Sequence, residues 1–419
     1  MIQPREARLF NVSDVRVSTV DKHTNEGEQA VRLCNYVDVY KNEVILNDFD
    51  FMPATCTPDE IARFRLAPGD VVFTKDSETA DDIGIPAFVK TSAPDLVCGY
   101  HVAIATPHQD LVDPKFLFWY LNSRPAFAWW ETRASGVTRV GLRQEDIRHL
   151  PLGALPPMSH QRAIADFLDR ETAQIDAMIE AQEVLILRIS EYDSAWRAYA
   201  VLPLLGSGDR LKTAMFETEE RANDAADSLP LLSVSIDWGV RRRDETSTNQ
   251  AASEDLSKYK VVCKGDIVLN RMRAFQGALG HSDEDGIVSP DYAVFRAREG
   301  VNPEWLSSIM RSAPFIEEMA SRIRGIGSAD SGQVRTPRLN ARDLLDIRLA
   351  LPSQAAQEDA LADWRERTGE VERVLDAASE GVRLLRERRD ALITAAVTGR
   401  IDPATGVERI DPTTEREAS

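Results

Sequence analysis

Two long segments of the chain repeat apolar residues every three or four positions, the spacing of a helix that buries one stripe. Each follows a Leu-Pro pair, at 155–156 and at 351–352, and continues for roughly forty residues, which is about 60 Å of helix at 1.5 Å per residue. The first stripe consists of Ile175, Met178, Leu185, Ile189, Tyr192 and Trp196. The second consists of Val371, Leu375, Val382, Leu385 and Leu392. Both stripes have the regularity of a coiled-coil seam.

Each long helix is preceded by short apolar runs rich in β-branched and aromatic residues, which predict strands. The expected strands are 30–39, 71–74 and 100–104 in the first half, and 229–238, 267–270 and 292–295 in the second. An Asx-Pro pair, Asp113-Pro114 or Asn302-Pro303, then begins an apolar helix, because the Asx side chain caps the free amides and proline presets the first turn. We expect the aromatic residues of helix 115–121 in the core, and a polar linker at 206–228.

Several pairs of positions in the two halves share one offset of 196 residues, which shifts to 197 at Leu142 and Leu339 and to 199 at Asp38 and Asp237. Gly69-Asp70 recurs as Gly265-Asp266, and the two Leu-Pro pairs keep the same distance. The same offset relates Gln161 to Gln357, Thr172 to Thr368, Ile175 to Val371 and Ile179 to Leu375. A single duplication therefore relates the halves, and two similar modules suit a partner that itself has two related parts.

The order module, helix, module, helix predicts an α+β protein with two mixed α/β domains separated by two long helices. Because modules and helices alternate, the helices can pair as an antiparallel coiled coil, the arrangement that the regular stripes favour. Packing of each helix on its own module is the alternative. The expected boundaries are 1–154 and 204–350 for the modules, 155–203 and 351–401 for the helical spacers, and 402–419 for a disordered tail.

Composition narrows the functional classes. The chain has 419 residues and a net charge of -18, which argues against binding of nucleic acid by bulk charge, so any such binding needs local basic patches or a basic partner. No apolar run is long enough to span a membrane and no secretion signal is recognised at Met1–Arg8, so we expect a cytoplasmic protein. The four cysteines and six histidines lack metal-site spacing, and no metal is expected.

Motifs of catalysis are weak or missing. The segments 275–280 and 289–292 faintly resemble two motifs of amino-methyltransferases, but Asp291 stands where that family has proline, and glycines between strands are more often hairpin turns. No phosphate-binding loop and no nucleophile elbow occurs in the sequence. We therefore expect no catalytic residues in this chain.

Basic residues near the ends of corresponding strands, and in a polar loop that follows, are better candidates for function. Arginine, threonine and lysine there suit phosphate contacts and contacts with base edges, although a solvated loop is the alternative. The candidate DNA-binding residues are Lys75, Arg133, Thr138, Arg139 and Arg143 in the first half, and Arg271, Arg273, Arg335 and Arg338 in the second. The run Arg241–Arg243 adds positive charge to the second half.

Four parts of the sequence carry a resemblance to a known family: 32–40, 69–78, Leu155-Pro156-Pro157 with Gln161–Ala165, and above all the ending Ala391–Asp402. In these parts the sequence resembles the specificity subunits of type I restriction-modification systems. One departure lies in the second spacer, where Leu361 comes one position later than the offset places Ile164.

The resemblance implies two target-recognition domains, each recognising one half of a split double-stranded DNA sequence, with the helical spacers setting the gap. It also implies two methyltransferase subunits bound to the helical regions, which modify adenine N6, and two motor-nuclease subunits that join for restriction. S-adenosylmethionine, ATP and Mg²⁺ are then needed in the partners, and this chain has no cofactor of its own. The implied function is a non-catalytic DNA-recognition subunit in bacterial phage defence. A protein-interaction scaffold in a defence complex is the main alternative, and a self-contained methyltransferase is a third.

Overall fold

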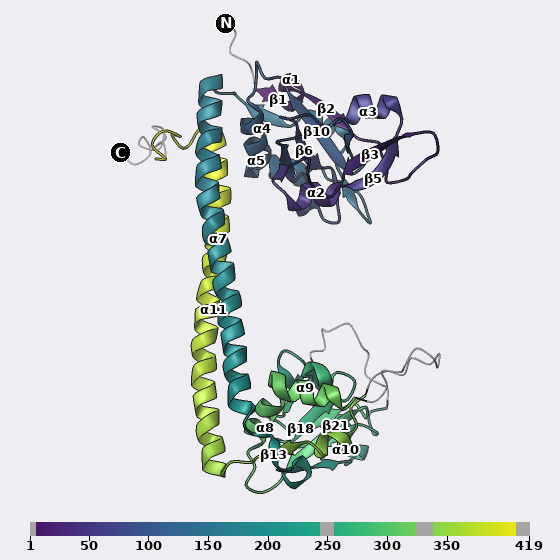
Figure 1. The fold of residues 1–419 in the computed structure, drawn as a ribbon, viewed down its shortest axis with the longest axis vertical. Coiled ribbons are helices and arrows are strands. Elements are labelled where there is room, and N and C mark those ends of the chain that lie inside the picture. Colours follow the sequence, from purple (N-terminus) through teal and green to yellow (C-terminus); the bar gives the residue numbers. More distant parts are fainter. Residues whose placement is uncertain (1–5, 244–254, 324–337, 408–419) are drawn as a thin grey trace. The chain divides into compact units, whose positions relative to one another are not determined.

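The computed structural model describes residues 6–243, 255–323 and 338–407. The chain forms two compact units, Met1–Gln182 with Glu380–Ser419 and Glu183–Ser379. Each unit contains one module built on a β-sheet, together with part of both long helices, α7 (Met158–Val201) and α11 (Gln354–Val397) (Figure 1). None of the helices in the described part of the chain combines the length and apolar character needed to cross a bilayer.

The first module is built on a five-stranded sheet in the order β2–β10–β6–β8–β4, antiparallel except for the parallel pair β4 and β8. Both faces of this sheet are buried: Val71 and Phe73 face the helices, while Val72 faces a second sheet, β5–β3–β9. Burial on both faces explains the continuous apolar run of β6. The strands are β1 (Ala7–Arg8), β2 (Ser13–Val17), β3 (Gln29–Cys34), β4 (Val44–Ile45), β5 (Met52–Cys56), β6 (Val71–Thr74), β7 (Asp76–Ser77), β8 (Pro86–Val89), β9 (Leu96–Cys98), β10 (Val102–Pro107), β11 (Val140–Gly141) and β12 (Pro151–Gly153). The helices are α1 (Leu9–Val12), α2 (Tyr36–Lys41), α3 (Pro58–Phe64), η1 (Ala80–Asp82), α4 (Pro114–Leu121), α5 (Arg124–Glu131) and α6 (Gln144–Arg148).

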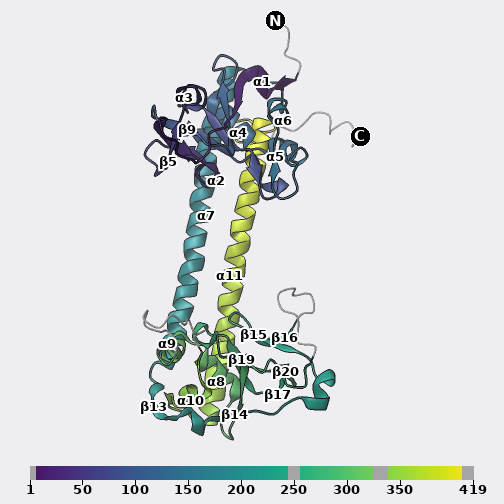
Figure 2. The same ribbon diagram turned by 90° about the vertical axis from the view of Figure 1, so that its right-hand side faces the viewer.

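The second module has the same arrangement of sheet and helices, but its central sheet has four strands instead of five. Its sheet order, β14–β21–β18–β19, matches β2–β10–β6–β8. Helices α8, α9 and α10 follow in the second module as α4, α5 and α6 do in the first (Figure 2). The strands are β13 (Leu205–Arg210), β14 (Met215–Thr218), β15 (Leu232–Ser235), β16 (Gly239–Arg242), β17 (Lys260–Val262), β18 (Ile267–Asn270), β19 (Leu279–His281), β20 (Gly286–Val288), β21 (Tyr292–Ala297) and β22 (Arg348–Leu349). The helices are η2 (Leu211–Thr213), η3 (Asn223–Ser228), η4 (Ala274–Gln276), α8 (Pro303–Met310), α9 (Ala313–Ser321) and α10 (Ala341–Leu345).

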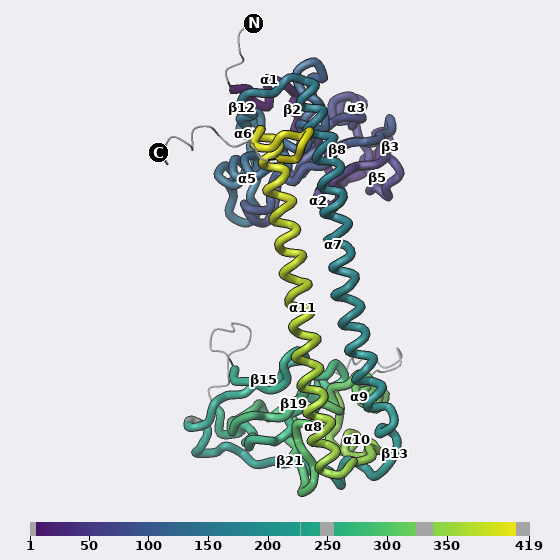
Figure 3. The backbone as a smooth tube through the Cα atoms, turned by 90° about the vertical axis from the view of Figure 1, so that its left-hand side faces the viewer, coloured from purple at the N-terminus to yellow at the C-terminus, as the bar shows by residue number. Residues whose placement is uncertain are grey.

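Within each unit α7 and α11 lie side by side and run antiparallel, as the sequence predicted (Figure 3). The alternative also holds in part, since Ile164, Phe167 and Leu168 of α7 belong to the first module's core. The helix positions that are buried or half-buried keep steps of three and four residues. On α7 they are Leu168, Thr172, Ile175, Ile179, Gln182, Ile186, Ile189, Asp193, Trp196 and Ala200, and on α11 the residues 196 positions later, from Trp364 to Ala396.

This seam includes most of the stripe residues expected from the sequence, but not all. Ile175, Ile189 and Trp196 lie in it, as do the five expected residues of α11. Met178, Leu185 and Tyr192 are instead 52%, 45% and 65% exposed. They are seven residues apart and form, with Tyr199, a second stripe on the outside of α7. Their part in partner binding stays a prediction.

A buried glutamine joins each module to its own long helix. The Gln161 side chain accepts a hydrogen bond from the Asp113 backbone N–H (2.8 Å) and donates to the carbonyls of Leu111 (3.2 Å) and Pro156 (2.9 Å). Gln357 accepts from the Asn302 N–H (2.8 Å) and donates to the Gly300 (3.2 Å) and Pro352 (2.9 Å) carbonyls.

The capped helix of each module is thereby tied to the start of its spacer. In both halves the Asx side chain accepts from two backbone amides of the helix that it caps, as the Asx-Pro pairs predicted.

A second contact at this junction keeps its geometry but reverses its charges. In the first half Lys115 of α4 pairs with Asp169 of α7, which also accepts from Trp119 Nε1 (2.9 Å). In the second half Glu304 of α8 accepts from Arg365 of α11, with 2.9 Å between Arg365 Nε and Glu304 Oε1. Asp169 and Arg365 are related by the 196-residue offset.

Two sequence expectations about local structure were wrong. The run 30–39 is strand only to Cys34, because the Asn35 backbone N–H donates to the Asp38 carboxylate (2.7 Å) and this capping starts α2. The expected linker 206–228 contains β14, which pairs with β21 and whose Met215 is buried in the second core. Of the tail, residues 402–407 form hydrogen-bonded turns, and the remainder lies outside the described residues.

Candidate nucleic-acid interface

In each module the end of the central strand lies beside a later segment that carries or follows predicted basic residues, as far as the described residues show. In the first module the Leu142 N–H donates to the Lys75 carbonyl just past β6 (2.8 Å). In the second, the Leu339 N–H donates to the Arg271 carbonyl just past β18 (3.0 Å). These bonds hold Leu142 and Leu339 against the two strand ends, so residues 67 and 68 positions apart in the sequence meet there.

Lys75 is largely buried, whereas a lysine that contacts phosphate is expected to be accessible. It is 8% exposed, its Nζ donates to Asp76 (2.6 Å), and Nζ also lies 4.5 Å from the centre of the Tyr100 ring. The Asp76 carboxylate also lies 2.9 Å from His101 Nδ1. The lysine charge is therefore already balanced within the module, and its role in DNA binding stays a prediction.

The other candidates of the first module differ in how far they are engaged. Arg133 stacks on Trp129, with its guanidinium carbon 3.1 Å from the ring centre, and Arg143 donates to Asp146 (2.8 Å). Thr138 and Arg139 are exposed. Neither side chain makes a hydrogen bond or ion pair to another residue in the described part of the chain. Among Arg133, Arg139 and Arg143, Arg139 is therefore the one whose guanidinium is exposed and not engaged by a described residue.

Beside Arg139 lies a cavity of about 380 Å³, called here the corner cavity. It is lined by Tyr36, Tyr40, Asp76, Ser77, Glu78, Asp82, His101 and Arg139. Tyr36 and Tyr40 come from one face of α2, and their rings stack with centres 5.4 Å apart. The pKa of the Tyr40 phenol is raised, first because its hydroxyl hydrogen-bonds to Asp82 and then because of the charge of that carboxylate.

At the second module's corner the candidates are arginines around a tyrosine. Arg271 is paired with Glu217, and the neighbouring Lys260, 2% exposed, donates to Glu219 (2.8 Å). That hydrogen bond from Lys260 is the main reason that the pKa of Glu219 is lowered. The two carboxylates balance Arg271, as Asp76 balances Lys75.

Arg273 and Arg338 are more accessible. Arg273 is exposed, and Arg338 is 4.0 Å from Asp291 across solvent-exposed side chains. The pKa of nearby Tyr292 is raised by burial, against the lowering effect of Arg243 and Arg273. Arg335 lies outside the described residues.

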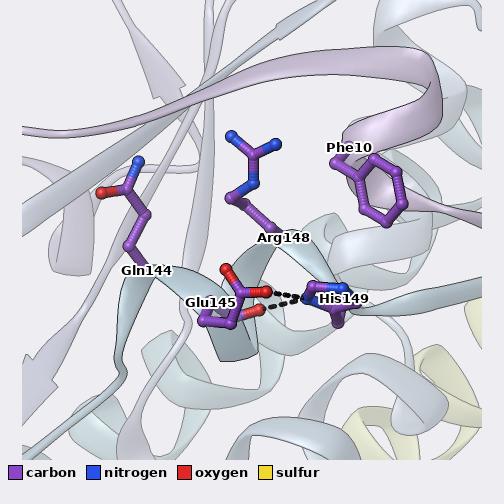
Figure 4. A pocket seen from close by; sticks show the side chains of 5 residues that line it. All are labelled: Phe10, Gln144, Glu145, Arg148 and His149. Carbon is purple, nitrogen blue, oxygen red and sulfur yellow. Dashed lines mark hydrogen bonds and ion pairs between the residues drawn. The ribbon is translucent and has the colours of Figure 1, made fainter.

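A separate hollow of about 500 Å³ opens beside α6. It is lined by Phe10, Gln144, Glu145, Arg148 and His149 (Figure 4). His149 Nδ1 is 2.8 Å from the Glu145 carbonyl oxygen and 3.2 Å from its carboxylate, one turn away on the same helix. The imidazole is therefore engaged by Glu145, and the residues that line the hollow include no serine, threonine, cysteine or lysine beside it.

The described residues contain no group of three or more acidic, histidine or cysteine side chains placed to hold a metal ion. All four cysteines are free thiols, three of them buried. Burial is the main cause that raises the pKa of Cys56, to about 11. Such a thiol is protonated at neutral pH and unsuited to nucleophilic attack.

Sequence reasoning missed the tyrosines, the acidic residues and Ser77 of the corner cavity, as well as Tyr292. Tyr36 and Tyr40 lay in a segment taken for a strand, whereas their spacing of four residues is the signal of one helix face. Asp76 and Ser77 form β7, Glu78 follows it and Asp82 ends η1, whereas Tyr292 begins β21. Only the folded sheets bring these positions to the two corners.

Comparison with solved structures identifies chains of the same fold. One comes from a structure of complex assembly and conformational transition in the type I R-M system, with a TM-score of 0.69 and 16% identity over 94% of this chain and 97% of that chain. Another is the HsdS subunit from Thermoanaerobacter tengcongensis, with a TM-score of 0.54 and 16% identity over 94% of this chain and 96% of that one. No protein-family model and no curated protein sequence matches the chain. The fold expected from the resemblance is confirmed.

Proposed function

We propose that this chain is the DNA-recognition subunit of a type I restriction-modification complex. The observation that carries the proposal is the shared architecture over nearly the full length of two such chains: two modules with matching sheets and two antiparallel helices. In this proposal each module recognises one half of a bipartite double-stranded target, and partner subunits supply adenine N6 methylation and restriction. The chain itself is not catalytic.

The corners described above are the proposed DNA-contacting surfaces. Exposed Arg139, Arg273 and Arg338 suit contacts with phosphates or guanine edges, whereas Lys75 and Arg271 support the corners through internal ion pairs. With a net charge of -18 the chain needs additional positive charge from elsewhere. Methyltransferase subunits that enclose the duplex would provide it.

The outer stripe of α7 is the proposed docking surface for a methyltransferase subunit. Leu185, Tyr192 and Tyr199 are 45%, 65% and 78% exposed on one helix face, and large apolar side chains in such a row mark an interaction site. The same stripe supports the second candidate, a protein-interaction scaffold without DNA recognition. The two candidates differ in whether the assembled complex selects a DNA sequence.

The test is to purify the chain with its methyltransferase partner and to sequence the adenines that the complex methylates in random duplex DNA. The expected result is one two-part motif with a fixed gap. The variant Arg273→Ala with Arg338→Ala should weaken selection in one half of that motif by about tenfold or more. A complex that assembles but enriches no sequence would favour the scaffold.

A further inference from the structure

The corner cavity of the first module carries an inference that rests on the proposed function and makes it more specific. Three elements with regular backbone structure, α2, β7 and η1, contribute side chains to its wall. Its β7 segment is held by backbone pairing of Ser77 with Val140, next to the loop that bears Arg139.

One polar atom in this wall lacks a partner. Ser77 is 4% exposed, and its Oγ makes no hydrogen bond to any described residue. A buried hydroxyl without a partner costs stability, so such a group in a cavity wall is suited to a ligand that completes its hydrogen bonding. Ser77 can serve either a donor or an acceptor on that ligand.

The charges of the wall restrict the ligand. Asp76, Glu78 and Asp82 contribute carboxylates, and Arg139 contributes the guanidinium. Asp76 is shared with Lys75 and His101, but Glu78 is exposed and has no such partner in the described residues. Three carboxylates would repel a phosphate, whereas they accept hydrogen bonds from an amino group.

In the major groove the amino donors are N4 of cytosine and N6 of adenine. Guanine, paired with cytosine, presents O6 and N7, the acceptors that a bidentate arginine contacts. The stacked rings of Tyr36 and Tyr40 add an apolar wall against which a planar base edge or a thymine methyl group can pack.

We propose that the corner cavity recognises a base pair through its exocyclic amino group, with the carboxylates and Ser77 as acceptors. Arg139 contacts the purine acceptors at the same or the adjacent pair. A single C·G pair offers both groups, the amino donor of cytosine and the O6 and N7 acceptors of guanine. At the positions that the offset relates to Asp76, Ser77, Glu78 and Asp82, the second module has Met272, Arg273, Ala274 and Ala278, which offer neither a carboxylate nor a hydroxyl group. The two halves of the target are therefore recognised by different chemistry.

The experiment compares the methylated motifs of complexes that contain Ser77→Ala, Arg139→Ala or wild-type chain. Neither side chain has a partner in the described residues, so both variants should fold and assemble. Arg139→Ala should reduce discrimination at one or two positions of a single half-site by about tenfold or more, and Ser77→Ala by about threefold. Lys90→Ala, an exposed cation of the same module outside the cavity, is the matched control and should leave the motif unchanged.

The outcomes separate this inference from the proposed function. Unchanged motifs in both cavity variants would overturn the inference while leaving the function intact. Weakened assembly with an unchanged motif would show instead that the cavity binds a cationic side chain of a partner protein. Absence of any motif with the wild-type chain would overturn the proposed function itself.

Discussion

The two module–helix junctions use the same hydrogen bonds but opposite charges. Gln161 and Gln357 each bind a helix cap and two carbonyls with nearly equal distances. A few residues away, Lys115 meets Asp169 in one half, whereas Glu304 meets Arg365 in the other. Replacing a buried glutamine with three hydrogen-bond partners leaves those partners unsatisfied. A partly exposed ion pair, in contrast, tolerates any exchange that keeps one positive and one negative side chain. The comparison separates positions fixed by hydrogen-bond geometry from positions fixed only by charge.

The largest expected effect comes from the glutamines. Gln161→Leu removes one acceptor and two donors from a buried site and should destabilise the first junction by about 3 kcal/mol, and Gln357→Leu should do the same in the second. Because the chain has two units, hydrogen exchange by mass spectrometry is the suitable measurement, since it reports each junction separately. The exposed Gln174→Leu is the control. Equal protection in variant and wild type would show that the amide is not essential.

A smaller effect is expected where the two Gly-Asp turns differ. Asp266 is bound by Arg296 through two hydrogen bonds, at 2.9 and 2.8 Å. Asp70 accepts from Thr106 instead, and Arg16 is 3.9 Å away.

Arg296→Ala should therefore cost about 2 kcal/mol, because a buried carboxylate loses its main partner, and Arg16→Ala about 1 kcal/mol. Thermal unfolding of each variant checks the order. A larger loss for Arg16→Ala would mean that the two turns are supported in another way.

The smallest effect is expected from the reversed ion pair. Asp169→Arg places a like charge beside Lys115 and should cost about 1 kcal/mol, a small value because both side chains are partly exposed. Adding Lys115→Glu recreates the second half's arrangement and should recover most of the loss. A double-mutant cycle measures the coupling. Zero coupling would mean that the pair contributes nothing to the junction.

Much of the architecture follows from the sequence. The strands at 71–74 and 267–270, the two Asx-Pro helix starts and both long helices agree with the structure, because each depends on local propensity and periodic burial.

The seam of α7 was predicted only in part, since this helix has two apolar stripes with the same period. Hydrophobicity favours the exposed Met178, Leu185 and Tyr192 over the packed Thr172, Gln182 and Asp193. The repeat in the second half distinguishes the two stripes of α7, because the packed residues of α11 lie 196 positions after the packed residues of α7. Leu361, which looked displaced from Ile164, corresponds to buried Ala165.

The candidate site was less accessible to sequence reasoning. Basic residues at strand ends were found, but whether each is free depends on contacts that no spacing encodes, such as Arg133 on Trp129 or Lys75 beside Asp76. The corner cavity needs four segments brought together by the sheet.

The reversed ion pair also has a consequence for inheritance. If the halves descend from one duplicated ancestor, a change from Lys-Asp to Glu-Arg took two substitutions, and the direct route passes through an intermediate with like charges in contact. A gene exchange that moves residues 1–154 alone into the second half would recreate that conflict, setting Lys115 against Arg365. An exchange that continues past Asp169 carries both partners along. The unit that recombination can transplant without loss is therefore a module together with the first turns of its helix.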